Sequence, residues 1–303
     1  MTNQIDLSII IVSYNTKVVL LNCLNSIKEF SSGFSYEVIV VDNASSDGSL
    51  KALYEYSKNN AFVKVIDGKK NLGFGKGNNL GTKEARGEYL LFLNSDTLLI
   101  DNALKVTLTQ VRELDQLGIY SCKLLNADKS TQASGGYFPN LFNVFAWQFF
   151  LDDLPIFKNL IPSFHPQTSA SEKNHFADWV TGAFMLMPKS VFDKLGGFDE
   201  NIFMYTEEME LAYRVKLANL KTYFSATPSI IHLAGASSGS FFALTSELKY
   251  LPYFWQKHKP HWQMPILKLF LFTGSLLRLL IFGIIKGDET RKRAYTTALR
   301  NII

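Results

Sequence analysis

Short apolar segments alternate with amphipathic segments along the first hundred residues. Four segments are rich in Val, Ile and Leu: residues 7–12, 36–41, 63–66 and 89–93. After the first of them, Val18, Leu21, Leu24 and Ile27 recur at the spacing of one helix face. Runs of four to eight such residues predict strands, and the 3.6-residue period predicts a helix. The pattern therefore predicts a strand, a loop and a helix in repeated order, with one such helix near residues 78–86.

The second half of the chain is less regular. Residues 179–187 and a segment ending at His232 predict two further strands, and residues 189–195 and 207–219 predict two helices. Residues 138–173 are rich in Phe and Pro and show no clear period, so we expect a long surface excursion there.

Strands that are apolar at nearly every position are typical of a parallel sheet covered on both faces. We therefore predict an α/β fold with a mostly parallel sheet and helices on both faces. In such sheets ligands bind at the carboxyl ends of the strands. Asn15, Asp42 and Asp96 each follow a predicted strand, so we expect them at one edge of the sheet.

Composition and charge divide the chain into a body and a tail. With 303 residues, 47% of them hydrophobic, the chain is long enough for a large core and an appendage. From residue 247 onward, ten Lys or Arg stand against three acidic residues, so this part has a formal charge of +7. The whole chain has a net charge of +4, so residues 1–246 sum to −3. We predict a main domain over residues 1–246 and a basic, apolar helical tail over 247–303. The total charge gives no reason to expect nucleic acid as a partner.

The cysteines and the amino terminus indicate the compartment. Cys23 and Cys122 lie far apart in sequence, so neither a disulfide framework nor a cysteine metal site is indicated, and both fit a core. Residues 1–4 are polar and lead directly into a predicted strand, without the features of a signal peptide. We therefore expect a cytoplasmic protein.

Two aspartates stand where a carboxylate could bind a ligand. Asp96 ends the sequence Asn94-Ser95-Asp96 and could hold Mg²⁺ or Mn²⁺ by oxygen ligation, although the same residues are ordinary turn formers. Asp42 could accept hydrogen bonds from a nucleobase or a ribose. The alternative role of helix capping fits residues 45–47 better, because they lie closer to the next helix.

Residues 71–79 contain Gly73, Gly75 and Gly77 and could let a phosphate or a sugar approach the backbone closely. The loop is neither a Rossmann fingerprint nor a P-loop. Both of those follow the first strand, where this chain has residues 13–15 without glycine or lysine.

Three carboxylates, Glu207, Glu208 and Glu210, begin a predicted helix. A helix start favours acidic residues electrostatically, but crowded carboxylates can also raise one pKa and produce a general base. His232 ends the last predicted strand. A histidine there is more often structural, yet near Asp96 it could complete a metal site.

Together these segments resemble the family 2 glycosyltransferases, and among them the rhamnosyltransferase-like enzymes of bacterial surface polysaccharide synthesis. The resemblance covers residues 6–240. It rests on seven segments in the family's order: residues 11–15, 40–48, 71–75, 94–96, 196–200, 205–211 and His232.

The resemblance implies a GT-A type fold, in which residues 1–100 bind the nucleotide and residues 101–246 meet the acceptor. It implies an inverting transfer of a sugar, with rhamnose as a candidate. The donor would be a dTDP- or UDP-linked sugar, and the acceptor a hydroxyl of a glycan or a lipid-linked saccharide. Asp96, with His232 as a further ligand, would hold Mg²⁺ or Mn²⁺, and Glu208 would be the catalytic base. The residues implied in nucleotide-sugar binding are Ser13, Tyr14, Asn15, Asp42, Asn71, Gly73, Asn78, Asn94 and Ser95.

The chain departs from the family's pattern at two places. The usual Asp-X-Asp is Asn94-Ser95-Asp96, so the metal site has one carboxylate fewer. The usual Glu-Asp pair is Glu207-Glu208, which leaves Glu207 as an alternative base.

Residues 265–285 are strongly apolar but include Lys268, Gly274 and Arg278, which interrupt a clean membrane span. One interpretation is an interfacial helix through which residues 247–303 make a peripheral contact with the inner face of the cell membrane. The other is a helix pair that packs on the body or forms a homodimer.

Two other functions fit parts of the pattern. A catalytically silent nucleotide-sugar binding module could use the same fold, but it would not need Asp96, Glu208 and His232 together. A sugar nucleotidyltransferase would need basic residues after the first strand, and residues 13–15 carry no charge.

Overall fold

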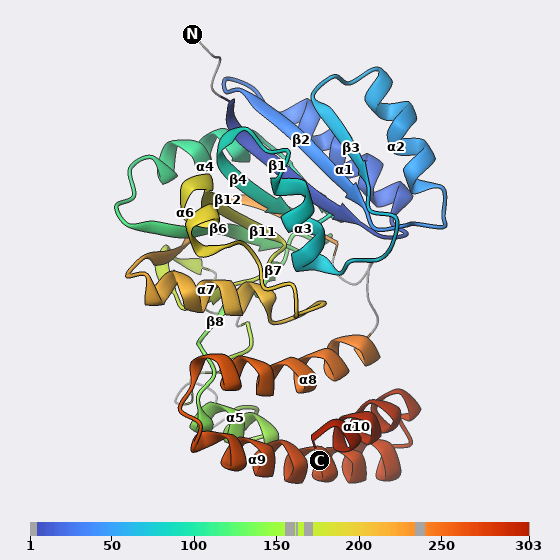
Figure 1. Cartoon of the computed structure of the whole chain (residues 1–303), viewed down its shortest axis with the longest axis vertical. Coiled ribbons are helices and arrows are strands. Elements are labelled where there is room, and N and C mark those ends of the chain that lie inside the picture. Colours follow the sequence, from blue (N-terminus) through green and yellow to red (C-terminus); the bar gives the residue numbers. More distant parts are fainter. Residues whose placement is uncertain (1–4, 155–160, 162, 167–171, 234–239, 303) are drawn as a thin grey trace. The chain divides into compact units, whose positions relative to one another are not determined.

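The computed structural model describes residues 5–154, 161, 163–166, 172–233 and 240–302. These residues form two compact units (Figure 1). Unit 1 comprises Met1–Gly136, Pro166–Phe203 and Glu207–Ser237, and unit 2 comprises Tyr137–His165, Met204–Thr206 and Ser238–Ile303. Each unit has its own core and is described by itself.

Unit 1 is built on a ten-stranded sheet whose main order is β3-β2-β1-β4-β11-β6-β12-β5. The short strand β7 pairs with β6, β9 pairs with β12, and β8 and β10 form a separate pair. The strands are β1 Ile5–Ser13, β2 Tyr36–Asp42, β3 Val63–Asp67, β4 Gly87–Leu93, β5 Thr97–Leu98, β6 Leu117–Leu125, β7 Thr131–Gln132, β8 Gly135–Gly136, β9 His175–Ala177, β10 Trp179–Val180, β11 Phe184–Pro188 and β12 Lys221–His232.

The sheet is mostly parallel, which confirms the predicted fold class. β1 runs parallel to β2 and β4, β2 to β3, and β6 to β12, whereas β11 is antiparallel to both β4 and β6. In this register Ser13 pairs with Asp42, and Asp42 pairs with Asp67. The strand ends that the sequence singled out therefore lie side by side at one edge.

Helices cover both faces of the sheet, as expected for strands that are buried on both sides (Figure 1). Leu20 and Leu24 of α1 and Leu104 of α4 share a core with Ile9 of β1. On the opposite face, α3 packs on β1 and β2. The helices of unit 1 are α1 Lys17–Phe30, α2 Ser49–Lys58, α3 Phe74–Thr82, α4 Ala103–Val111, α6 Lys189–Leu195 and α7 Glu207–Leu217.

The glycine-rich segment is mostly helical, so the predicted helix near residues 78–86 begins earlier and ends earlier than expected. Two of its glycines let α3 lie close to the sheet. A Cβ atom at Gly77 would stand 2.9 Å from Val12 Cγ1, and one at Gly81 would stand 2.6 Å from Ile10 Cγ2. A side chain at either position would push α3 off the sheet.

Unit 2 is helical. Its elements are α5 Leu141–Gln148, α8 Ser240–His258, α9 Gln263–Arg278, the π-helical segment η2 Leu279–Ile285 and α10 Glu289–Ile302. Its core contains Phe254 and Trp255 of α8, Leu267 and Leu271 of α9 and Tyr295 of α10. Among the described residues, the stretch Gln263–Ile285 is long and apolar enough to cross a membrane by length and composition alone.

The excursion predicted over residues 138–173 is wrong in part. Residues 155–160, 162 and 167–171 lie outside the described residues, but α5 forms within the segment and packs on α9 of unit 2. Unit 2 therefore includes Tyr137–His165 together with the C-terminal helices. The division at residue 246, and the nucleotide and acceptor halves, stay predictions.

Candidate functional site

The loops after β1 and β4 are joined by buried hydroxyl groups. Ser13 Oγ lies 2.9 Å from Thr16 Oγ1, which donates a hydrogen bond of 3.1 Å to Ser95 Oγ. Ser13, Thr16 and Ser95 are each at most 5% exposed. Both predicted binding residues, Ser13 and Ser95, therefore act in part as structural links that fix the edge of the sheet.

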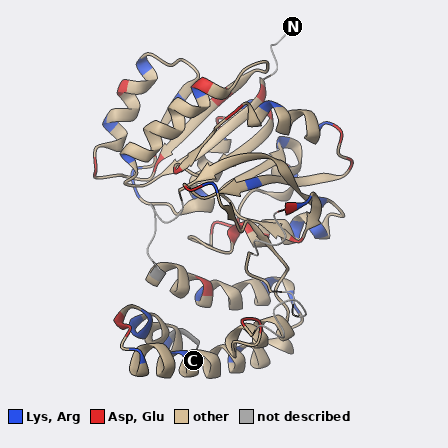
Figure 2. Cartoon of the chain, turned by 180° about the vertical axis from the view of Figure 1, so that it is seen from behind, with Lys and Arg blue, Asp and Glu red and all other residues tan. Residues whose placement is uncertain are grey.

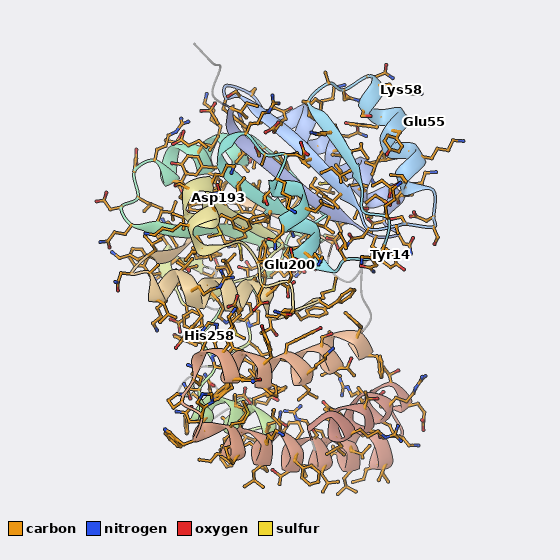
Figure 3. All side chains as sticks on the ribbon, in the orientation of Figure 1. Tyr14, Glu55, Lys58, Asp193, Glu200 and His258 are labelled. Carbon is orange, nitrogen blue, oxygen red and sulfur yellow. The ribbon has the colours of Figure 1, made fainter. Side chains whose placement is uncertain are left out.

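Asn15 and Asp42 meet at the loop after β2. The backbone N–H of Asn15 donates to Ser45 Oγ at 2.9 Å, and the side-chain Oδ1 of Asn15 accepts from the backbone N–H of Ser46 at 2.7 Å. Asp42 Oδ2 accepts from the Ser45 amide at 2.9 Å. Tyr14, between the two strand ends, is exposed to 42% (Figure 3).

Asp42 is fully buried, and its Oδ1 has no hydrogen-bond partner among the described residues. A buried carboxylate oxygen left in this state costs free energy. A ligand that donates a hydrogen bond there would remove the cost. This makes Asp42 the best-placed side chain at this edge for a nucleobase imide or a ribose hydroxyl.

Asn71 and Asn78 shape the backbone beside this edge. Asn71 Oδ1 accepts from the Gly73 amide at 3.0 Å, and Asn78 Nδ2 donates to the Phe74 carbonyl at 3.0 Å. Asn43, which the sequence reasoning did not select although it stands next to Asp42, donates to the Gly73 carbonyl at 3.1 Å. The side-chain oxygens of Asn43 and Asn78 are buried without a partner among the described residues.

Gly73 is required by its surroundings. Its φ is +79°, and a Cβ atom there would lie 2.1 Å from the Phe203 carbonyl oxygen. That carbonyl accepts a hydrogen bond of 2.9 Å from the Phe74 amide. The close approach inferred from the sequence is therefore an approach of protein backbone to protein backbone.

Asp96 and His232 lie together at the far side of the same edge. Asp96 is 2% exposed, and its Oδ1 is 3.3 Å from His232 Nε2. Asn94 Nδ2 stands 3.2 Å from the same nitrogen. The pairing of β12 with β5, which sets His232 opposite Thr97, brings the two segments into contact.

Gln132 orients this histidine and was missed by the sequence reasoning. His232 Nδ1 is 2.6 Å from Gln132 Oε1, and Gln132 Nε2 donates to Asn126 Oδ1 at 2.9 Å. Because an amide oxygen only accepts, Nδ1 donates the hydrogen of this bond, and the bond turns Nε2 toward Asn94 and Asp96. Gln132 lies in the two-residue strand β7, and nothing in the local sequence marks it.

A carboxylate beside an imidazole nitrogen is a donor set that fits Mg²⁺ or Mn²⁺. In the part of the chain that the structure describes, no group of three or more His, Cys, Asp or Glu gathers to hold a metal ion. Two protein ligands suit a cation whose other ligands are substrate phosphates and water. The residues therefore fit a cation that binds together with a diphosphate.

Glu207 and Glu208 form a carboxyl pair at the start of α7. Glu207 is 2% exposed, whereas Glu208 is half-buried. Burial, and then the neighbouring charge of Glu208, raise the pKa of Glu207 well above its usual value, and the two side chains are hydrogen-bonded. Burial and the neighbouring charge therefore favour the protonated form of Glu207, and Glu208 is the more exposed carboxylate of the pair.

The pair lies beside the glycine-rich helix. A Cβ atom at Gly75 would stand 3.7 Å from Glu207 Cβ and 3.0 Å from Phe198 Cβ. The carbonyl of Phe203, four residues before Glu207, accepts the hydrogen bond from the Phe74 amide described above. The start of α7 is thus fixed against the start of α3 within unit 1.

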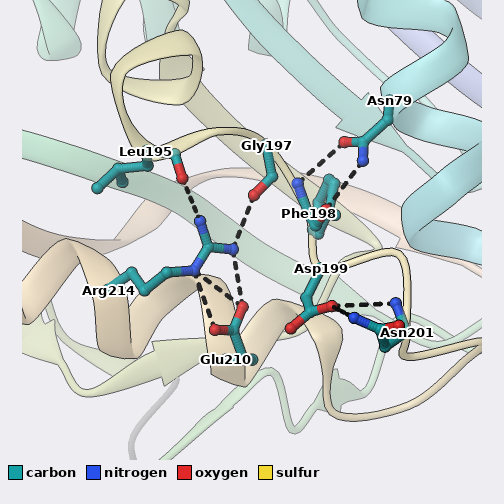
Figure 4. A network of polar contacts seen from close by, with 8 residues as sticks. All are labelled: Asn79, Leu195, Gly197, Phe198, Asp199, Asn201, Glu210 and Arg214. Carbon is teal, nitrogen blue, oxygen red and sulfur yellow. Dashed lines mark hydrogen bonds and ion pairs between the residues drawn. The ribbon is translucent and has the colours of Figure 1, made fainter. Parts of the chain in front are cut away.

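The third carboxylate, Glu210, is structural (Figure 4). It is fully buried and accepts from Arg214 Nε at 3.0 Å and from Nη2 at 2.7 Å. Arg214 also donates to the carbonyls of Leu195 at 2.6 Å and Gly197 at 2.7 Å. The ion pair therefore holds the glycine turn after α6 onto α7, and Glu210 is not available as a base.

Asn79 secures the next part of that segment (Figure 4). Its Oδ1 accepts from the Phe198 amide at 2.9 Å, and its Nδ2 donates to the Phe198 carbonyl at 2.9 Å. The motif at residues 196–200 thus serves to place the chain that leads into the carboxyl pair.

The model of the family described as "Glycosyl transferase family 2" matches residues 8–195. The chain belongs to this family. It is therefore a glycosyltransferase, and the predicted enzyme class is confirmed.

Curated relatives of this family 2 glycosyltransferase include two rhamnosyltransferases. Rhamnosyltransferase WbbL of Escherichia coli is 29% identical over 230 residues, which cover 71% of this chain and 82% of WbbL. N-acetylglucosaminyl-diphospho-decaprenol L-rhamnosyltransferase of Mycobacterium tuberculosis is 22% identical over 244 residues, 76% of this chain and 78% of that protein. O-antigen biosynthesis protein RfbC of Myxococcus xanthus is 28% identical over 67% of this chain, but the match spans only 15% of RfbC.

Two solved structures show that the fold is of the GT-A type. Mannosyltransferase PcManGT from Pyrobaculum calidifontis, in complex with GDP-Man and Mn²⁺, has a TM-score of 0.60 at 14% identity, over 99% of this chain and 88% of that chain. GalNAc-T7 with UDP, GalNAc and Mn²⁺ has a TM-score of 0.59 at 16% identity, over 96% of this chain and 58% of that chain.

Proposed function

We propose that this glycosyltransferase catalyses an inverting, divalent-cation-dependent transfer of a sugar from a nucleoside diphosphate to a hydroxyl group of the acceptor. The observation that carries the proposal is the contact of Asp96 with His232, whose Nε2 is turned toward the carboxylate by the bond of Nδ1 to Gln132. The Mn²⁺ bound to two enzymes of the same fold supports it.

The donor nucleotide binds along the ends of β1, β2 and β4. Asp42 accepts a hydrogen bond from the base or the ribose at its buried Oδ1, and Tyr14 and Asn15 flank it. Uracil and thymine both offer an imide N–H to such an acceptor, which fits a UDP- or dTDP-linked sugar. The remaining residues proposed to line the donor site are Ser13, Asn71, Gly73, Asn78, Asn94 and Ser95.

Asp96 and His232 would hold Mg²⁺ or Mn²⁺ together with the diphosphate. A divalent cation there would neutralise the charge that develops on the leaving diphosphate. Asn94 binds His232 and a donor hydroxyl but adds no charge, so one carboxylate carries the protein's share of the compensation.

Glu208 is the base. The acceptor oxygen forms a bond to the anomeric carbon while the bond from that carbon to the diphosphate oxygen breaks. The hydroxyl proton passes to Glu208, and the electron pair leaves with the diphosphate. One displacement inverts the anomeric centre without a covalent enzyme intermediate. Glu207, whose pKa is raised by its burial and by the charge of Glu208, is the buried partner that keeps this carboxylate in place.

The similarity to the two rhamnosyltransferases makes rhamnose the first sugar to test, and a glycan or a lipid-linked saccharide the first acceptor. We place the reaction in bacterial surface polysaccharide synthesis on the cytoplasmic side of the membrane. The second candidate function is that of a catalytically silent module, which would bind the same nucleotide sugar without transferring the sugar to an acceptor.

Binding of the nucleotide should raise the melting temperature, and the cation should be needed for the full effect. Uridine, thymidine and guanosine diphosphates are compared with and without Mn²⁺ by thermal shift. A ligand at a hundred times its Kd stabilises by about 2.7 kcal/mol. Asp96→Asn should lose the Mn²⁺-dependent part and keep the rest. Absence of a cation-dependent shift for all three nucleotides would favour the silent module.

Gln132→Leu should weaken Mn²⁺ binding in the presence of nucleotide by about 10- to 100-fold, because His232 loses the acceptor that fixes its tautomer. Electron paramagnetic resonance titration of Mn²⁺ measures this directly. Gln132→Glu keeps an acceptor and should restore most of the affinity.

Gln110→Leu is the matched control for that measurement. Gln110 also uses both ends of its amide, bonding Tyr120 Oη at 2.7 Å and the Thr227 carbonyl at 3.0 Å, and does not contact His232. Equal Mn²⁺ affinity in the two leucine variants would contradict the positioning role of Gln132.

A further inference from the structure

The outer face of α9 and η2 is apolar and exposed. Trp262, Leu269, Leu276, Leu280 and Ile284 recur every seven or four residues, so they share one side of the helix. Each of them is between 48% and 65% exposed. A helix of a globular protein normally turns polar residues to water, and a continuous exposed apolar stripe marks a contact surface. We call these five residues the apolar stripe.

The opposite side of the same helix is already occupied. Leu267, Leu271 and Ser275 are fully buried, and α9 contacts α5, α8 and α10 within unit 2. The apolar stripe is therefore not the core-facing side of the helix. It is a second apolar face, and no other element of unit 2 covers it in the described residues.

Basic residues stand at both ends of the apolar stripe. Lys257 and Lys259 precede Trp262, Lys268 lies within α9, and Lys286 follows Ile285. The chain from residue 247 onward carries ten basic and three acidic residues, and Figure 2 shows Lys and Arg along the helices of unit 2. Lysines attract anionic headgroups, and a tryptophan at the end of an apolar face is typical of the membrane–water interface.

We propose that α9 and η2 lie flat in the surface of an anionic phospholipid bilayer, with the apolar stripe in the acyl region and the flanking lysines at the phosphate groups. Binding combines apolar area with electrostatic attraction, as for interfacial amphipathic helices.

The helix does not cross the bilayer, although its length would allow it. Its covered side holds Arg278, which is 7% exposed, donates to the Trp147 carbonyl and stacks on Phe150 at 4.2 Å. A spanning α9 would have to leave α5 and carry this guanidinium, with the buried Ser275, into hydrocarbon. Both changes are costly.

A second copy of the chain fits the apolar stripe less well than an anionic lipid surface does. A two-fold dimer places the same surface on both partners, so the lysines flanking one stripe would face those flanking the other. Like charges at an interface oppose association, whereas an anionic lipid surface is complementary to the same lysines.

Vesicle flotation of the full chain tests the proposal without any sugar donor or acceptor, so its outcome is independent of the proposed transfer. We expect flotation with vesicles of equal parts phosphatidylcholine and phosphatidylglycerol, a smaller bound fraction in high salt, and little binding to phosphatidylcholine alone. The double variant Leu276→Asp, Leu280→Asp should lower the partition coefficient by at least about tenfold. Leu276→Phe, Leu280→Phe should keep it.

The control is Val106→Asp, Leu217→Asp, two exposed apolar positions of unit 1. It should float like the unchanged protein, and circular dichroism should show the same helix content for every variant. Three results would overturn the proposal. They are no flotation of the unchanged chain, a dimer in solution that the aspartate pair dissociates, or protein that resists alkaline carbonate extraction as a spanning helix does.

Discussion

Glu208→Gln should nearly abolish sugar transfer while donor binding remains. A positioned base contributes roughly a hundredfold to ten-thousandfold in rate, and glutamine cannot accept the acceptor proton. The transfer rate is measured in single turnovers, and nucleotide affinity by calorimetry with Mn²⁺ present. Unchanged affinity with a large loss of rate would identify a group that acts in the chemical step.

Glu207→Gln is the matched control at the adjacent position. Glu207 is buried, and its pKa is raised by that burial and by the charge of Glu208, so a neutral amide of the same shape can take its place and donate to Glu208. We expect the rate to fall by less than about tenfold. If Glu207→Gln were the inactive variant and Glu208→Gln the active one, the assignment of the base would have to be exchanged.

Glu210→Leu should destabilise the protein by about 3–5 kcal/mol, because it leaves the Arg214 guanidinium without its carboxylate in a buried place. The glycine turn after α6 would lose its anchor at the same time. The free energy of unfolding is obtained from urea titrations monitored by circular dichroism.

Asp193→Leu supplies the comparison for that measurement. Asp193 pairs with Lys189 at the same four-residue spacing, at 2.6 Å, but both side chains are partly exposed (Figure 3). An exposed pair of this kind contributes about 0–1 kcal/mol. Similar losses in the two variants would show that burial of the Glu210–Arg214 pair is not what makes it important.

The sheet could be predicted from the sequence because its central strands are apolar at nearly every position. A strand of this kind fits few structures other than a covered parallel sheet, and the polar residue that ends it then marks the edge. Asp42 and His232 end such strands, and Asp96 follows one. Their places at strand ends follow from the local pattern, whereas the contact of Asp96 with His232 depends on the pairing of β12 with β5.

The parts that could not be predicted depend on contacts between distant segments. Gln132 reaches His232 because β7 and β12 both pair with β6, and a two-residue strand leaves no periodic signal. The early start of α3 is equally hidden in the sequence, because glycine disfavours helices in isolation, whereas packing of Gly77 and Gly81 on the sheet outweighs that preference. Arg214 is only four residues from Glu210, but the Leu195 and Gly197 carbonyls that fix the guanidinium come from the turn after α6.

The bond between the Phe74 amide and the Phe203 carbonyl has a consequence for how such an enzyme can change. It involves main-chain atoms alone, so it survives replacement of nearly every side chain around it. The spacing between the starts of α3 and α7, and with it the position of the proposed base, would then change little when side chains are replaced, while the neighbouring side chains could still alter which sugar is accepted. Related enzymes that keep this main-chain hydrogen bond could therefore change their sugar specificity and still remain active.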